Sequence, residues 1–154
     1  MLHLVHASIA EADPARPRVV LRAERLQLAK RRWRGVAEDG MEFGFELDRP
    51  LRDGETFFQT ATARYVIEQR PEAVVEVALD IAPSAAAGIG WAVGNLHLEL
   101  QAEARRLLAP DEPAARQLLD RLKVPYRTTT AIFRPGRFVR GEGASHELGP
   151  SHKH

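Results

Sequence analysis

Short apolar runs alternate with polar turns along the chain, and this pattern changes character at Arg70–Pro71. The turn-forming pairs Asp39–Gly40 and Asp53–Gly54 divide the first part into short segments. Its alternating apolar stretches lie at Val19–Leu21, Met41–Leu47 and Tyr65–Ile67. A period of two residues and Asp-Gly turns are typical of small antiparallel sheets. The pattern therefore predicts a small antiparallel β domain over residues 1–70.

After Pro71 the apolar positions predict strands interrupted by two helices. Ser84 is expected to cap the first helix, and the Gly94–Asn95 pair to end it, because both of these residues tolerate the left-handed conformation. Asp111 is the expected cap of the second helix, with Pro113 in its first turn. The predicted strands are the run from Glu72, His97–Gln101, Ala104–Leu108 and Val124–Phe133.

The resulting order of strand, helix, strand, strand, helix, strand is that of the ferredoxin-like fold, expected over residues 71–140. After Phe133 glycine and proline punctuate the chain and apolar periodicity disappears, so no fixed structure is expected. We predict a flexible His-containing tail at residues 141–154. The expected fold class is thus a two-domain β then α+β chain that ends in this tail.

Composition narrows the possible functions. The sequence is 44% hydrophobic with a formal charge of +1, as expected of a soluble globular protein without a general attraction to nucleic acid or membranes. It has no cysteine, so soft-metal chemistry must use imidazole. No signal peptide or long apolar run is evident, which predicts a cytoplasmic protein. The basic run at Lys30–Arg34 is expected to be a solvated or protein-docking face rather than a nucleic-acid site.

Histidine is the most informative residue type. Of six histidines, three lie in the last nine residues, namely His146, His152 and His154. Imidazole binds nickel, copper and zinc, but these tail residues need further ligands to fill a coordination sphere. His97 is a candidate ligand, although a lone histidine after a helix is also explained by a bond to the backbone. His3 and His6 are expected to be edge-strand residues, since their spacing places them on opposite faces of a strand.

Several motifs together resemble one protein family. They are Leu51–Glu55 (LRDGE), Ala63–Val77 (ARYVIEQRPEAVVEV), Gly94-Asn95-Leu96-His97, and Phe133-Arg134-Pro135-Gly136 followed by histidines. In order and spacing the chain resembles the UreE family of urease accessory proteins, which are nickel metallochaperones. Leu96 stands where the family signature has arginine.

The resemblance implies a non-enzymatic Ni²⁺ chaperone for urease maturation. It implies a homodimer in which the His97 residues of two copies share one ion, while His146, His152 and His154 complete the site. Zn²⁺ or Cu²⁺ is expected to bind the same ligands in vitro. The implied partners are the urease apoprotein and its maturation GTPase and accessory complex, with residues 1–70 as the docking domain.

Two other functions are compatible with the residues. The first is a protein–protein adaptor that docks through the arginine-rich face, with Val36–Ala37 and Phe43–Phe45 as its apolar patch and with incidental metal binding. The second is a zinc enzyme, which requires an acid or base near the metal. Glu99 and Glu103 are the nearest carboxylates in sequence, and strand alternation places Glu99 on the same face as His97. A solvated role is the simpler explanation for Glu99.

Overall fold

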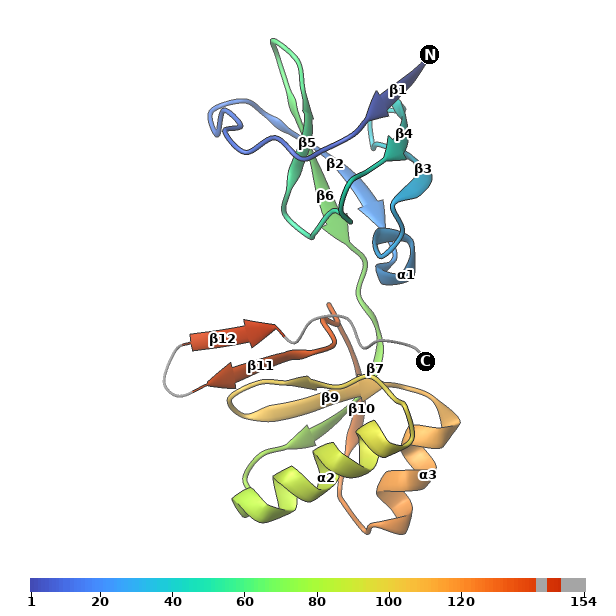
Figure 1. The fold of residues 1–154 in the computed structure, drawn as a ribbon, viewed down its shortest axis with the longest axis vertical. Coiled ribbons are helices and arrows are strands. Elements are labelled where there is room, and N and C mark those ends of the chain that lie inside the picture. The colour runs from blue at the N-terminus through green and yellow to red at the C-terminus, as the bar shows by residue number, and fades with distance from the viewer. Residues whose placement is uncertain (141–143, 148–154) are drawn as a thin grey trace. The chain divides into compact units, whose positions relative to one another are not determined.

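The computed structural model describes the backbone of residues 1–140 and 144–147. The chain forms two compact units, Met1–Arg70 and Pro71–His154, which we name the N-terminal unit and the C-terminal unit (Figure 1). The described residues contain many strands and few helices, so the prediction of a mixed, β-rich chain is confirmed. Among those helices, none combines the length and the apolar character that crossing a membrane requires.

The N-terminal unit consists of two small sheets and a short helix. Their strand orders are β1-β4-β3 and β2-β6-β5. The elements are β1 (Leu2–Val5), β2 (Arg18–Ala23), α1 (Arg25–Leu28), β3 (Arg32–Val36), β4 (Glu42–Glu46), β5 (Thr56–Gln59) and β6 (Arg64–Gln69). Gly40 and Gly54 have φ angles of 89° and 85°, so both predicted Asp-Gly turns are confirmed.

The prediction that this unit is purely antiparallel is wrong. Strand β1 is parallel to β4, and β2 is parallel to β6. Each of these pairs joins an early strand to a distant later one, so a long connection replaces the two-residue hairpin that an antiparallel pair permits. Local turn signals identify hairpins, but they carry no information about such distant pairings.

Aromatic side chains fill the core of the N-terminal unit. Trp33 stacks on Phe45 with ring centroids 4.0 Å apart, and Phe43 meets Phe57 edge-on at 4.9 Å. The Tyr65 hydroxyl donates to Asp39 Oδ2 at 2.6 Å. This hydrogen bond lowers the pKa of Asp39 and raises the pKa of Tyr65 to about 12. It thereby joins the β3–β4 turn to the core.

This packing corrects one of the proposed docking surfaces. Ala37, Phe43 and Phe45 are all buried, so they cannot form the apolar patch that the adaptor hypothesis placed there. Only Val36 of that patch is exposed, at 58%. Trp33, the aromatic residue of the basic run, faces the core and is therefore unavailable for stacking on a nucleic-acid base.

The C-terminal unit contains an antiparallel sheet of order β10-β7-β9-β8 with helices α2 and α3 packed on one face (Figure 1). In chain order its elements are β7 (Glu72–Ala78), α2 (Pro83–Asn95), β8 (Gln101–Ala102), β9 (Arg106–Pro110), α3 (Pro113–Arg121), β10 (Arg127–Ala131), β11 (Arg137–Arg140) and β12 (Ala144–Glu147). The core beneath the helices is formed by Val75, Val77, Ile89, Val93, Leu107, Ala109, Ala115, Leu118 and Leu119. The opposite face, which the helices leave uncovered, holds a smaller cluster of Val74, Leu108 and Phe133.

Both predicted helix caps are wrong by a residue or two. Helix α2 begins at Pro83 after Ala82, and Ser84 lies inside its first turn. Helix α3 begins at Pro113 after Glu112, while Asp111 instead accepts two hydrogen bonds from Arg116. In both helices proline occupies the first turn, where its missing N–H costs no hydrogen bond and its fixed φ favours the helix.

The expected lack of structure after Phe133 is also corrected. Residues 137–140 and 144–147 form the antiparallel hairpin β11–β12, in which Phe138 registers with His146. The predicted flexible tail, residues 141–154, therefore contains a strand. The remaining tail positions, 141–143 and 148–154, lie outside the described residues.

Candidate metal site

His97 lies in the turn that ends helix α2, not in a strand as predicted. Helix α2 ends at Asn95, within the predicted Gly94–Asn95 stop, but the left-handed residue is His97 and not one of that pair, with a φ angle of 57°. The His97 N–H donates to Gly94 O at 2.9 Å, and the Leu98 N–H donates to Val93 O at 3.2 Å. These two bonds form a Schellman motif, in which His97 occupies the position that glycine usually takes.

Packing explains why the chain turns at His97. Leu98 packs against the core cluster that contains Val93, and this apolar contact is the usual companion of a Schellman cap. A left-handed non-glycine residue costs about 1–2 kcal/mol, so burial of Leu98 outweighs that strain. Lys123, at the end of α3, has the same conformation with a φ of 56° and the same two bonds. The backbone alone therefore does not distinguish His97.

What distinguishes His97 is its surroundings. Its side chain is exposed, and no residue in the described part of the chain hydrogen-bonds the ring. Trp91, 71% exposed, and Leu96, 41% exposed, lie close to it in sequence on and after α2. Gly88 and Gly94 flank Trp91 at helical spacing, and no atom lies within 4 Å of the position of an added Cβ at either. We name Trp91 and these two glycines the Trp91 patch.

Two of the other histidines, His3 and His6, make contacts within the N-terminal unit. The His3 ring packs on Phe43 and Phe58, with centroids 5.7 and 5.1 Å away, and Nδ1 of His6 is 3.1 Å from Glu46 O. His146 lies on strand β12, while His152 and His154 lie outside the described residues. Where the structure describes side chains, no three histidine or carboxylate groups gather closely enough to hold an ion.

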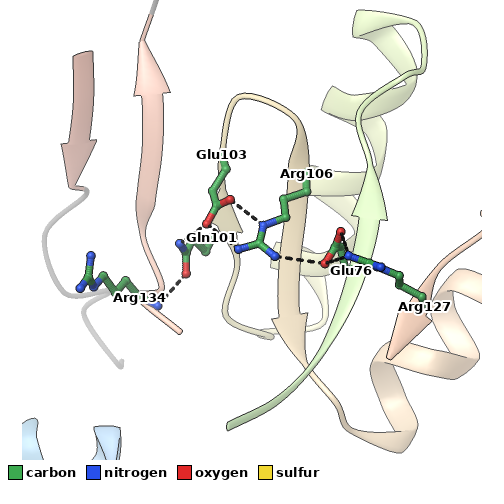
Figure 2. Close-up of polar contacts among 6 residues, drawn as sticks. All are labelled: Glu76, Gln101, Glu103, Arg106, Arg127 and Arg134. Atoms are coloured by element: carbon green, nitrogen blue, oxygen red, sulfur yellow. Dashed lines mark hydrogen bonds and ion pairs between the residues drawn. The ribbon is translucent and has the colours of Figure 1, made fainter. Parts of the chain in front are cut away.

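A polar network lies across the face of the C-terminal sheet that carries no helix (Figure 2). Arg106 bonds Glu103 at 2.6 Å and Glu76 at 3.1 Å, and Arg127 bonds Glu76 at 3.0 Å. Burial raises the pKa of Glu76, but the hydrogen bonds from Arg127 and Arg106 outweigh burial and leave that pKa below its usual value. The network continues from Glu103 to the buried Gln101.

The C-terminal unit matches a known protein family. The family model described as "UreE urease accessory protein, C-terminal domain" matches residues 72–154, more than half of the chain. The chain belongs to the UreE family. UreE proteins are accessory proteins and not enzymes, so the prediction of a non-enzymatic protein is confirmed.

Two curated relatives carry the name urease accessory protein UreE. The protein from Bifidobacterium longum subsp. infantis is 32% identical over 96 residues, which cover 62% of this chain and 43% of the relative. The protein from Nitrosococcus oceani is 30% identical over 130 residues, which cover 83% of this chain and 75% of the relative. This UreE-family chain thus spans less than half of the first relative and three quarters of the second.

Sequence reasoning missed two features of this UreE-family chain. The exposure of Trp91 could have been predicted from the sequence, because it is a single large aromatic residue among the alanines and glycines of α2. Nothing in the sequence indicated the network around Gln101, since a glutamine in a short apolar strand can lie on either face of the sheet. Glu99, the carboxylate offered as a partner for His97, lies in the loop between α2 and β8, so strand alternation does not relate the two residues.

We predict that His97→Gly changes the free energy of unfolding of the metal-free protein by less than about 1 kcal/mol. Glycine removes the left-handed strain, and this gain offsets its extra entropy in the unfolded chain. His97→Val, whose branched Cβ resists this conformation, lowers the free energy of unfolding by about 1–2 kcal/mol. Urea denaturation measures both values.

Lys123 supplies the matched control for this pair. Lys123 occupies the same kind of cap at the end of α3. Lys123→Gly is therefore expected to leave the free energy of unfolding nearly unchanged, and Lys123→Val to lower it. Equal losses from glycine and valine at position 97 would show that the left-handed backbone of His97 is not a source of strain.

Proposed function

We propose that this protein is a nickel-binding metallochaperone that delivers Ni²⁺ for maturation of the urease active site. The observation that supports this most directly is the exposed imidazole of His97 in the turn that ends α2, the helix that carries the exposed Trp91. An imidazole is a suitable ligand for Ni²⁺, and its exposure permits both capture and release. The relatives named urease accessory proteins support the same pathway. The protein is proposed to act in the cytoplasm.

The ion is proposed to lie between two copies of the chain. One imidazole does not fill the sphere of four to six ligands that Ni²⁺ takes, so a second copy of His97 is the simplest further ligand. A residue that lies on the two-fold axis of a dimer faces its own copy, so the proposal places His97 at that axis. The Trp91 patch supports such a contact, because tryptophan is enriched at the centre of interfaces. Leu96, which replaces the arginine of the family signature, is a further exposed apolar residue next to His97 in sequence.

The tail is proposed to complete the site. His146, His152 and His154 supply the remaining imidazoles, and Zn²⁺ or Cu²⁺ would compete for the same ligands in vitro. We further propose that residues 71–140 are a ferredoxin-like domain. The element order of the C-terminal unit and the antiparallel pairing of its four-stranded sheet support this assignment.

The N-terminal unit is proposed to dock the urease apoprotein and its maturation GTPase and accessory complex. Leu2, Leu4 and Val36 are exposed large apolar residues on the sheet β1-β4-β3. Arg34 lies on the same face, in register with Gly44. This surface also favours an alternative function, a protein–protein adaptor with incidental metal binding. Partner capture that withstands a chelator and deletion of the tail would favour the adaptor.

A nickel titration tests the metal site. We predict that His97→Gly weakens binding of the shared ion, with a loss of affinity larger than the roughly 10- to 100-fold effect of altering an outer-sphere residue. Lys123→Gly, the same change in the equivalent cap, leaves binding unchanged. Isothermal calorimetry on the metal-free full chain measures both. Unaltered affinity and stoichiometry in His97→Gly would exclude His97 as a ligand.

A second measurement tests the interface. Trp91→Ser is expected to raise the dimer dissociation constant by about 30-fold, the equivalent of about 2 kcal/mol for a central interface residue. Leu26→Ser is the control, because Leu26 is 67% exposed but lies on α1 in the N-terminal unit. Sedimentation equilibrium gives both constants. A dimer that tolerates Trp91→Ser as well as Leu26→Ser would place the contact elsewhere.

A further inference from the structure

The base of the tail hairpin is held against the segment that follows the His97 turn. Phe133 is fully buried with Val74 and Leu108 on the helix-free face of the sheet. The Arg134 N–H then donates to the side-chain oxygen Oε1 of Gln101 at 2.7 Å. The Gly136 N–H donates to Leu100 O at 2.8 Å. These contacts fix the chain at residues 133–136, immediately before β11.

Gln101 is the polar residue at the centre of this contact. It is only 4% exposed, so an unmade hydrogen bond at its amide would cost about 1–3 kcal/mol. Both ends are satisfied, because Nε2 donates to Glu103 Oε1 at 3.0 Å while Oε1 accepts from Arg134 (Figure 2).

The surrounding charges determine which way this amide points. Glu103 forms an ion pair with Arg106, and an ionised carboxylate only accepts hydrogen bonds. Glu103 therefore requires the NH₂ end of Gln101, and the carbonyl end must face the Arg134 N–H. The Arg106–Glu103 pair thus orients the acceptor that holds the tail.

This contact lies between two of the proposed nickel ligands. His97 is three residues before Leu100, and Phe138, the Cα partner of His146, is two residues after Gly136. The turn that bears one ligand and the hairpin that bears another are consequently joined within a single chain. Shortening the free path between two binding groups raises their effective concentration at a shared ion.

We propose that Gln101 is a positioning residue that fixes the base of the β11–β12 hairpin to the segment after the His97 turn, and so restricts where strand β12, which bears His146, can lie relative to His97. The inference rests on the proposed function for its role in metal binding. The anchoring contact itself is independent of metal, so the two are tested separately.

Hydrogen exchange of the metal-free full chain tests the anchor. Gln101→Leu keeps a similar volume but removes both amide bonds, and exchange over residues 134–140 is expected to rise about tenfold, as for one lost hydrogen bond. Amides in α2 and α3 keep their protection, which shows that the variant is folded. Arg127→Gln, at the far end of the network, leaves residues 134–140 unchanged. Unaltered exchange in Gln101→Leu would overturn the anchor.

Gln101→Glu provides a second variant with a different expectation. Burial beside the Glu103 carboxylate favours the protonated form of the new side chain, whose carbonyl accepts from the Arg134 N–H and whose O–H donates to Glu103. Exchange at Arg134 should therefore remain closer to wild type than in Gln101→Leu. If both variants exchange alike, the side-chain carbonyl of Gln101 does not hold the tail and the proposal fails.

Nickel titration then tests the consequence for binding. Gln101→Leu is expected to weaken Ni²⁺ binding by roughly 2- to 10-fold, because the tail must search a larger volume. In a background where His146, His152 and His154 are all alanine, Gln101→Leu should have no effect. An equal loss in both backgrounds would contradict positioning through the tail. Failure of the proposed function appears separately, as unchanged binding in His97→Gly.

Discussion

The left-handed backbone of His97 is the constraint on which the proposed metal site depends. It reverses the chain directly after α2, so Leu98 enters the core while the residue before it remains at the surface. Exposure of the imidazole therefore accompanies the packing of Leu98 against the core directly after the turn.

The two faces of the C-terminal sheet carry different groups of residues. The helix-covered face supplies most of the core and presents the end of α2. The helix-free face holds the Phe133 cluster and the ion-paired network that leads to Gln101. In the proposed metal site, the first face positions the turn that bears His97, and the second positions the strand that bears His146.

Sequence patterns predicted those features that local chemistry determines. The turns at Gly40 and Gly54 and the approximate positions of the two long helices follow from glycine conformation and apolar spacing. Features that depend on long-range contacts could not be predicted from local sequence patterns. Helix α2 ends at Asn95, within the predicted Gly94–Asn95 stop, but the left-handed residue is His97, and Leu98 after it packs against the core. The parallel pairing of β1 with β4 and the hairpin after Phe133 likewise depend on distant partners.

We propose that one Ni²⁺ is held by two copies of His97. X-ray absorption at the nickel edge, on protein loaded with one ion for every two chains, counts the imidazole ligands directly. If the ion is shared, His97→Gly lowers that count by about two for each ion, because both copies lose their ring together. A count that falls by one would show that each chain binds its own ion, and an unchanged count would show that His97 is not a ligand.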